Sequence, residues 1–174
     1  MKRILPEALS GAYRFVEADS VEFEELYGLY RSNISYFEYF ALSPTRERLV
    51  RDMTMLPDGC TQEQKLFLAC YDADRLTALI DLIAGYPDEK TCYIGLFMVD
   101  AALQGRGVGT RIITDLCAAL GAAGYEALRL AYGKHYAHAA HFWTKNGFVP
   151  VREAALEEYG ELIVAQRGIQ REER

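Results

Sequence analysis

The sequence has 174 residues, of which 51% are hydrophobic, and its 19 Lys and Arg against 25 Asp and Glu give a formal net charge of -6. This length predicts one globular domain over residues 1–174, because a domain takes roughly 100 to 200 residues. The negative charge offers no basic field to a nucleic-acid backbone or an anionic membrane, so neither is an expected partner. It favours a cationic or amine-bearing small molecule, although an acidic surface also simply keeps a protein soluble.

The cysteines and the N-terminus both indicate a cytoplasmic protein. The cysteines show neither a C-x-x-C pair nor metal-ligand spacing, three of them lie within apolar segments, and they are expected to be buried thiols of a reducing cytosol. The first residues reach Pro6 and Glu7 before an apolar signal segment can form, and no stretch approaches the roughly 18 apolar residues of a membrane span. The four widely spaced cysteines are Cys60, Cys70, Cys92 and Cys117.

The N-terminal part of the chain predicts a strand and then an amphipathic helix. Residues 13–18 alternate apolar and polar side chains after a Ser-Gly break, which predicts the strand. In residues 21–30 the apolar side chains recur three and four positions apart, and acidic residues in the first turn suit the helix dipole. Asp19 and Ser20 are the expected cap of this helix.

A second helix is expected over residues 44–56, with Ser43 as its cap and Pro44 at the first helical position. Between the two helices, residues 35–40 concentrate four aromatic rings in the run Ser-Tyr-Phe-Glu-Tyr-Phe. Aromatic rings are more often buried for packing than used for recognition. This segment is therefore expected to be a core hinge or, alternatively, a wall of the substrate pocket.

The middle of the chain predicts three antiparallel strands followed by a long helix. Residues 66–71, 76–84 and 91–99 are apolar runs rich in β-formers, and short polar loops separate them. Residues 108–120 carry one apolar stripe at helical spacing, and the glycines of residues 121–124 are expected to end the helix.

The C-terminal third predicts a strand, a short helix and two more strands. These are residues 127–132, 137–146, 148–151 and 162–165, and the charged residues 170–174 are expected to fray. The fold class is therefore α/β (α+β), with a single mixed, mostly antiparallel sheet and helices on both faces.

The glycine-rich segment before the long helix predicts a phosphate site. Gly105, Gly107 and Gly109 allow successive N–H groups to converge on one ligand, and a helix N-terminus adds a favourable dipole. A Walker-type loop does not fit, because no lysine stands at the helix start. A dinucleotide fingerprint does not fit either, because the glycines run G-x-G-x-G and the next strand ends without an acid.

Two segments together resemble the GNAT superfamily of acyl-CoA-dependent N-acetyltransferases. Gln104, Gly107 and Gly109 stand where that family has its Q/R-x-x-G-x-G/A motif, between a strand and a long helix. Residues 139–148, AAHFWTKNGF, resemble the family's A-x-x-[FL]-[YW]-x-K-x-G-F helix and turn. The resemblance covers residues 66–151 and implies the GNAT fold, N-acetyltransferase activity and acetyl-CoA as the acetyl donor.

The resemblance also implies where acetyl-CoA binds. The strand before the glycine turn would offer backbone groups to the pantetheine arm, and an N–H near Met98 or Val99 would polarise the thioester carbonyl. The N–H groups of the turn would bind the pyrophosphate, with Arg106 adding charge at the rim. The implied cofactor-binding residues are Phe97, Met98, Val99, Gln104, Gly105, Arg106, Gly107, Val108, Gly109, Thr110 and Phe142.

The general acid is not at the position that the family motif gives it. Acetyl transfer to an amine needs an acid that reprotonates the departing CoA thiolate. Many family members have a tyrosine where this chain has Trp143, and indole is not a useful proton donor. Tyr136, before the last helix, is the alternative acid, with Tyr132 and His138 behind it. A packing aromatic is the other interpretation of Tyr136.

The general base has no family position either, because some relatives carry a glutamate where this chain has Tyr93. Asp81 is the sharpest alternative. A lone carboxylate in an apolar strand is costly to bury, so it is expected to face a cleft or a structural partner. Glu89 is a looser candidate that fits a solvated loop equally well. No metal site is expected, because no acidic ligand is spaced with the three histidines of residues 135–141.

The expected activity is transfer of an acetyl group from acetyl-CoA to a primary amine of a small molecule, by direct attack in a ternary complex. A peptide or protein amine is the less favoured acceptor. The alternatives are a non-catalytic acyl-CoA-binding module or sensor, which Trp143 and the missing glutamate favour, and a nucleotide-binding protein of another fold. The acceptor pocket is expected to be formed by the N-terminal helices and the aromatic cluster of residues 36–40. A homodimer stays open, because dimers are common among the proteins that the chain resembles.

Overall fold

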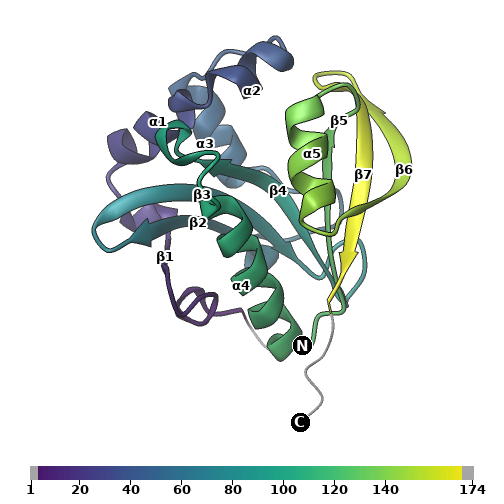
Figure 1. Ribbon diagram of the computed structural model, residues 1–174, viewed down its shortest axis with the longest axis horizontal. Helices are drawn as coiled ribbons and strands as arrows, with labels where there is room; N and C mark the ends of the chain where they lie inside the picture. Colours follow the sequence, from purple (N-terminus) through teal and green to yellow (C-terminus); the bar gives the residue numbers. More distant parts are fainter. Residues whose placement is uncertain (1–3, 170–174) are drawn as a thin grey trace.

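One seven-stranded sheet, in the order β1-β2-β3-β4-β5-β7-β6, organises the computed structural model, which describes residues 4–169 (Figure 1). The strands are β1 (Arg14–Glu17), β2 (Lys65–Asp72), β3 (Arg75–Ala84), β4 (Thr91–Val99), β5 (Ala127–Gly133), β6 (Val149–Leu156) and β7 (Gly160–Gly168). The helices are α1 (Phe23–Ser32), α2 (Ile34–Tyr39), α3 (Arg46–Thr54), α4 (Val108–Ala123) and α5 (Ala137–Lys145).

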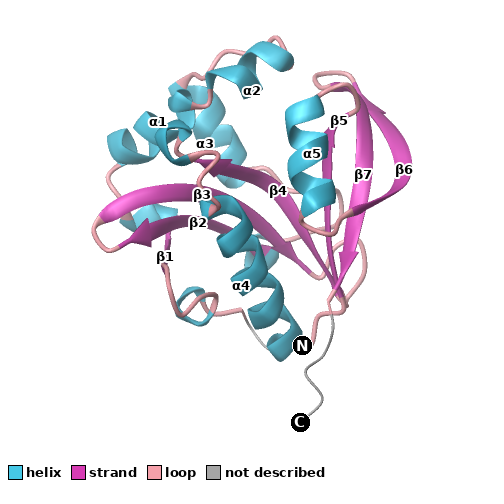
Figure 2. Ribbon diagram, in the orientation of Figure 1, coloured by secondary structure: helices cyan, strands magenta, loops and turns pink. Residues whose placement is uncertain are grey.

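The sheet is mixed, because β4 and β5 pair in parallel while the other neighbouring strands pair antiparallel. Helices α1 to α3 lie on one face and α4 on the other, with α5 against the strands β5 and β7 (Figure 2). The predicted α/β fold, with a mixed, mostly antiparallel sheet and helices on both faces, is confirmed.

Strand β3 is apolar along almost its whole length because both of its faces are buried. Ile80 and Leu82 pack into the core beneath α4, whereas Leu79, on the opposite face, packs into the core beneath α1 to α3. Alternate side chains of a strand point to opposite faces. A central strand with both faces covered therefore has a continuous run of apolar residues. The predicted three-strand meander is confirmed as β2, β3 and β4.

Helix α4 is confirmed close to its predicted bounds. Ile112, Leu116 and Leu120 on its inner face are fully buried. The helix ends at Gly124, which adopts the left-handed conformation with φ 97° that favours glycine at this position. The long apolar stripe thus fixes both the length of the helix and the face that it buries.

Both predicted helix caps in the N-terminal half are wrong. Ser20 lies in the 3-10 turn η2 (Ala18–Ser20), and its hydroxyl donates to the Glu17 carbonyl at 2.7 Å, so it closes the end of β1 instead. For α3, Thr45 is the cap, because its Oγ1 accepts from the Arg48 amide at 3.1 Å. The proline before it stays outside the helix.

The last two strands are longer than predicted. Their apolar runs are short, but β6 and β7 pair antiparallel through residues 149–166. The paired residues include polar side chains beyond the apolar runs. The four cysteines are free. Within the described residues, no helix is long and apolar enough to cross a membrane. The predicted frayed tail lies outside the described residues.

Candidate functional site

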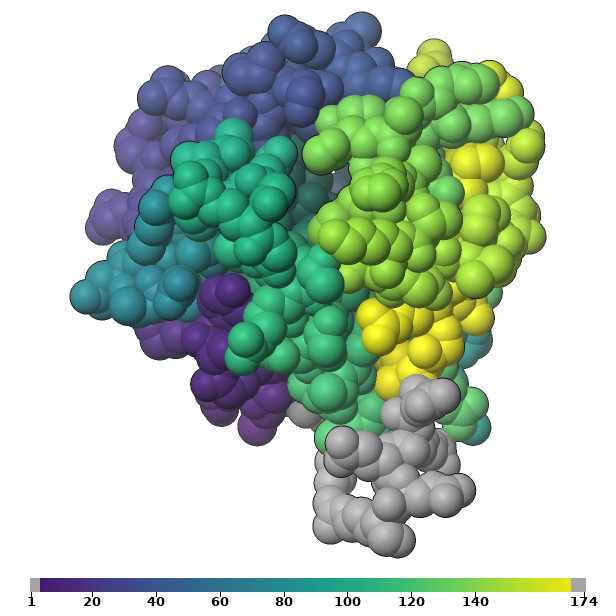
Figure 3. Space-filling model, in the orientation of Figure 1, coloured from purple at the N-terminus to yellow at the C-terminus, as the bar shows by residue number. Residues whose placement is uncertain are grey.

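A cleft of about 610 Å³ opens where β4 and β5 separate (Figure 3). Within residues 4–169 the two strands pair only between residues 91–94 and residues 127–130. Beyond these pairs, residues 95–99 of β4 and 131–133 of β5 line the two walls of the cleft. A strand edge that has lost its neighbour presents backbone N–H and C=O groups to whatever enters the gap.

A β-bulge at Gly95 bends β4 at the point where the cleft opens. Asp81 lies opposite Leu96 and Leu82 lies opposite Ile94, so Gly95 is the extra residue. A bulge of this kind bends the strand and increases its twist. A Cβ atom at Gly95 would overlap Oδ2 of Asp81, so glycine also makes room for this carboxylate.

The glycine turn presents a row of unused backbone donors. Gly105 and Gly107 adopt φ values of 74° and 81°, in the left-handed region that favours glycine. Within the described chain, none of the N–H groups of residues 105–110 donates a hydrogen bond, and the first that does is Arg111, to the Gly107 carbonyl at 3.0 Å. Together with the N-terminus of α4, these donors form a site suited to an anion such as a phosphate.

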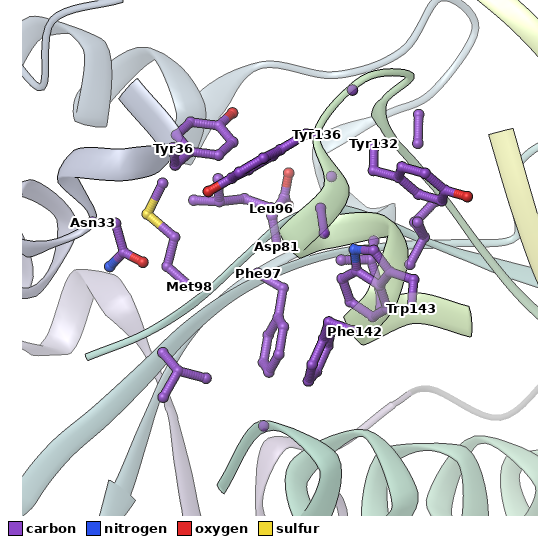
Figure 4. Close-up of a pocket in the computed structure, with 18 of the residues that line it drawn as sticks. Asn33, Tyr36, Asp81, Leu96, Phe97, Met98, Tyr132, Tyr136, Phe142 and Trp143 are labelled. Carbon is purple, nitrogen blue, oxygen red and sulfur yellow. The ribbon is translucent and has the colours of Figure 1, made fainter. Parts of the chain in front are cut away.

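Phe142 of α5 packs against the start of α4. An added Cβ at Gly109 would come within 3.0 Å of the Phe142 ring, so the two helices can approach this closely only because Gly109 has no side chain. The Phe142 ring also stacks on Phe97 of β4, with centroids 6.0 Å apart (Figure 4). The two rings line the cleft beside the glycine turn.

Most of the residues that the resemblance implies for acetyl-CoA binding line this one cleft. Arg106 and Val108 do not: Arg106 is exposed on the turn, and Val108 packs against the core beneath α4. Gln104 lines the cleft, but its side-chain Nε2 donates to Asn33 and to the Val99 carbonyl. The residues that line the cleft as expected are Phe97, Met98, Val99, Gln104, Gly105, Gly107, Gly109, Thr110 and Phe142.

Tyr136 lies at the mouth of the cleft, immediately before α5. Its ring stacks on Tyr39 of α2, with centroids 4.5 Å apart and planes 12° apart, and its hydroxyl donates to Ser35 Oγ at 3.3 Å. Tyr39 packs directly over Gly133, where a Cβ atom would overlap its ring. Helix α2 therefore closes against the turn between β5 and α5, and holds Tyr136 facing the cleft.

Trp143, at the position of the family tyrosine, is a packing residue of the cleft floor. Its side chain packs among Phe97, Phe142 and Phe148, with ring centroids 4.8 to 5.8 Å away. Tyr132 of β5 also lines the cleft, and burial raises the pKa of its hydroxyl. Figure 4 shows Tyr132, Tyr136 and Trp143 around the same opening.

Asp81 both lines the cleft and has a structural partner, so the two expectations for it hold together. Its carboxylate is 10% exposed, and Oδ2 accepts from Nζ of Lys65, which is 3% exposed, at 2.9 Å. Oδ1 is buried and accepts no hydrogen bond within residues 4–169. Burial raises the pKa of Asp81 to about 6, although the Lys65 ammonium opposes that rise. A carboxylate with this pKa suits a general base near neutral pH.

The aromatic segment of residues 35–40 divides between the two expected roles. Phe37 is buried in the core beneath α1 to α3, whereas Tyr36 and Phe40 line the cleft. Asp52 of α3 and Tyr159 of the β6–β7 turn line the cleft as well, and no sequence motif marks either residue. Their signal was weak, because a lone acid on an amphipathic helix and a tyrosine in a turn are common surface residues.

The histidines before and on α5 are not gathered around one point. His138 and His141 line the cleft, while Nε2 of His135 lies 3.4 Å from Glu161 Oε2 on the surface. Across residues 4–169, no group of three or more His, Cys, Asp or Glu side chains is placed to hold a metal ion.

The comparisons with known proteins agree with this geometry. The model of the Acetyltransferase (GNAT) family matches residues 24–148. An acetyltransferase from Thermus thermophilus superposes with a TM-score of 0.69 at 20% identity, over 96% of this chain and 99% of that one. A GCN5-related N-acetyltransferase from Kribbella flavida gives 0.64 at 24% identity, over 90% and 98%.

The ribosomal-protein-S18-alanine N-acetyltransferase from Escherichia coli has the same fold, with a TM-score of 0.65 at 13% identity over 91% of this chain and 94% of that one. Among curated proteins, no sequence matches the chain. The similar solved structures show the fold. The family model covers most of the chain, including the glycine turn and α5. The chain therefore belongs to the acetyltransferase (GNAT) family.

Proposed function

We propose that this protein transfers the acetyl group of acetyl-CoA to a primary amine of a small molecule. The observation that carries the proposal is the row of unused N–H groups over residues 105–110, which opens directly into the cleft between β4 and β5. A pyrophosphate suits these donors, and a thin extended arm suits the unpaired edge of β4. The cleft continues past Gly95 to a second half walled by α2 and α3, which leaves room for an acceptor.

The residues present fit acetyl-CoA as co-substrate. The N–H groups of Gly105, Gly107 and Gly109 would hold its phosphates, and no Cβ atom stands in their way. The Phe97 and Phe142 rings would border the arm that leads to the thioester. The backbone of Val99 would offer an N–H to the thioester oxygen, where negative charge develops during attack, because the Met98 N–H faces Leu79 in the ladder between β3 and β4.

Asp81 and Tyr136 have the chemistry for the two proton transfers. The carboxylate of Asp81 accepts a proton from the acceptor ammonium, directly or through water, which leaves a neutral amine. The amine nitrogen then bonds to the acetyl carbon, and as the carbon–sulfur bond breaks the nitrogen releases a second proton to solvent, which leaves the neutral amide. The hydroxyl of Tyr136 donates its proton to the leaving sulfur and regains one from solvent.

An acyl-CoA sensor is the second candidate, because Trp143 and Tyr93 stand at the positions where relatives carry an acid and a base. Two measurements separate the candidates. Acetyl-CoA should raise the thermal unfolding temperature, and thiol release from acetyl-CoA should be detected with at least one member of a panel of alkylamines, polyamines, amino acids, aminoglycosides and peptides. A thermal shift without thiol release across the panel favours the sensor, and no thermal shift contradicts both candidates.

A further inference from the structure

We propose that the acceptor half of the cleft selects an arylalkylamine and rejects amines that carry a carboxylate beside the amino group, and that Asp52 sets this preference. The inference rests on the proposed function and specifies its acceptor. The acceptor half, here called the acceptor recess, is the part of the cleft bounded by α2, α3, the β3–β4 loop and the β6–β7 turn.

Aromatic rings form the walls of the acceptor recess. On one side Phe40 contacts Tyr36 and Tyr159, with ring centroids 5.0 and 5.3 Å apart, in edge-to-face arrangements. On the other side Tyr86 and Tyr93 meet edge to face at 5.5 Å. All five side chains line the cleft. Such walls favour a flat apolar body and can also stabilise an ammonium over a ring face.

The charges that face into the recess are negative. Asp81 comes from β3 and Asp52 from α3, and both line the cleft. One oxygen of Asp52 accepts from the Tyr30 hydroxyl at 2.6 Å, and burial raises the pKa of its carboxyl. The two carboxylates repel each other, because the negative charge of Asp52 also raises the pKa of Asp81. An entering ammonium relieves this repulsion, whereas an entering carboxylate adds to it.

The cations near the recess are paired with carboxylates and do not line the cleft. Lys65 lies behind Asp81 and does not line the cleft. Arg48 and Arg51 of α3 both bind Glu158 of the β6–β7 turn, and neither lines the cleft. These cations balance the buried carboxylates from outside. Arg48 keeps one buried nitrogen, Nη1, without a hydrogen-bond partner within residues 4–169, but this side chain does not line the cleft.

The basic residues that do line the cleft come from a single helix. Within the described chain they are His138, His141 and Lys145, all on α5, the helix that carries Phe142 to the glycine turn. The carboxylates thus come from β3 and α3, and the basic side chains from α5, where His138 lies nearest to α2, with its ring centroid 6.0 Å from that of Tyr136. An acceptor with a carboxylate next to its amine would place that group against Asp52 or Asp81, and the Lys and Arg side chains nearest to them, Lys65, Arg48 and Arg51, do not line the cleft.

Three acceptors that differ in one group test the proposal. Phenethylamine has no substituent beside the amine, L-phenylalaninamide has a neutral amide there, and L-phenylalanine has a carboxylate of similar size. We expect kcat/KM from thiol release to be at least tenfold higher for phenethylamine and L-phenylalaninamide than for L-phenylalanine. Equal rates for all three, or a preference for L-phenylalanine, overturn the proposal. If kcat/KM for L-phenylalaninamide is as low as that for L-phenylalanine, the size of the substituent and not its charge sets the preference, and the proposal is overturned as well.

Asp52→Asn tests the assigned residue. Asparagine retains an oxygen that can accept from Tyr30 but removes the charge, so we expect the ratio of kcat/KM between phenethylamine and L-phenylalanine to fall at least fivefold. Glu24→Gln is the matched control, because Glu24 is an exposed carboxylate that pairs with Arg46 outside the cleft. An unchanged ratio in Asp52→Asn contradicts the assignment.

The affinities of the same three compounds for the acetyl-CoA-free protein, measured by calorimetry, test the proposal independently of turnover. The same order of affinities supports the recess as proposed, even if the proposed catalysis fails. Turnover of other amines from the panel, with none of phenethylamine, leaves the proposed function standing and overturns the inference. Absence of binding by all three compounds overturns it too.

Discussion

Gln104 of the glycine turn donates from Nε2 to Oδ1 of Asn33, between α1 and α2, at 2.9 Å and to the Val99 carbonyl at 3.0 Å. Asn33 is 7% exposed, and the hydroxyl of neighbouring Ser32 accepts from the Ala101 amide at 3.3 Å. The loop that would bind the phosphates is therefore hydrogen-bonded to the helices that border the acceptor recess. Gln104 stands at the family motif, and its side chain positions the turn.

Replacing Gln104 by Met, which has a similar shape but no amide, should loosen the turn. The variant loses both hydrogen bonds of the amide, and we expect the loosened turn to raise the Kd for acetyl-CoA about fivefold, which corresponds to roughly 1 kcal/mol of binding free energy. The free energy of unfolding should fall by about 1–2 kcal/mol, because Oδ1 of buried Asn33 loses its donor. Isothermal titration calorimetry and urea unfolding measure the two quantities.

The matched control for this variant is Gln62→Met. The Gln62 amide also donates to a backbone carbonyl, that of Thr54 at 3.0 Å, but it lies outside the cleft. It should leave acetyl-CoA affinity unchanged. If Gln104→Met binds acetyl-CoA as tightly as the wild type, the amide does not position the turn.

Gly107→Ala should abolish most of the thermal shift produced by acetyl-CoA. An alanine at φ 81° strains the backbone by about 1 kcal/mol and disturbs the N–H groups of the turn. Gly59→Ala is the matched control, because Gly59 has φ 82° and, like Gly107, no atom within 4 Å of an added Cβ. Both variants should lose similar stability by differential scanning fluorimetry. Only Gly107→Ala should lose the response to acetyl-CoA, and an equal response in the two variants would contradict the phosphate assignment.

The parts of the fold that could be predicted from the sequence are those in which a local pattern also decides the long-range packing. The stripe on α4 and the apolar run of β3 are of this kind, because burial on one or two faces leaves a direct periodic signal. The glycine turn could be predicted too, since Gly105 and Gly107 mark backbone conformations that other residues rarely adopt.

The acceptor recess could not be predicted in the same way, because its residues meet only through tertiary structure. Asp52 is held by Tyr30, 22 positions away, and Tyr159 reaches Phe40 from the opposite end of the chain. Ser20 shows the same limit on a smaller scale. A serine before a helix is a common cap, but here the Ser20 hydroxyl donates to the carbonyl of Glu17.

Tyr136→Phe should lower kcat for an identified acceptor at least tenfold while the Kd for acetyl-CoA changes little. The substitution removes only the hydroxyl, so the ring stays stacked on Tyr39. Tyr39→Phe is the control, because it removes the hydroxyl that accepts from the His135 amide at 3.1 Å and should leave kcat nearly unchanged. Equal kcat values for Tyr136→Phe and the wild type would show that Tyr136 is a packing aromatic, and Tyr132→Phe would then be measured as the next candidate acid.

The pH dependence of kcat/KM should report the ionisation of Asp81. Because the pKa of Asp81 in the folded protein is raised to about 6, from an ordinary 3.8, the base is protonated and inactive below that pH and active above it. The rate should therefore fall on the acid side with a midpoint near pH 6. The effect of Asp81 on stability has the opposite sense, because the folded state holds this proton more tightly than the unfolded chain does. The contribution of Asp81 to the free energy of unfolding is present below pH 4 and is lost as the pH rises through 6.

Two neighbours of Asp81 move this midpoint in opposite directions, which separates a role as base from a general loss of structure. Lys65→Met removes the ammonium that opposes the effect of burial, so the pKa of Asp81 should rise and the acid limb should shift upward. Asp52→Asn removes a negative charge that raises the same pKa, so the limb should shift downward. Asp81→Asn should remove the limb and most of the rate. If steady-state rates between pH 5 and 9 show the same acid limb in all three variants, another group is the base, since each variant changes the charge on or beside this one carboxylate.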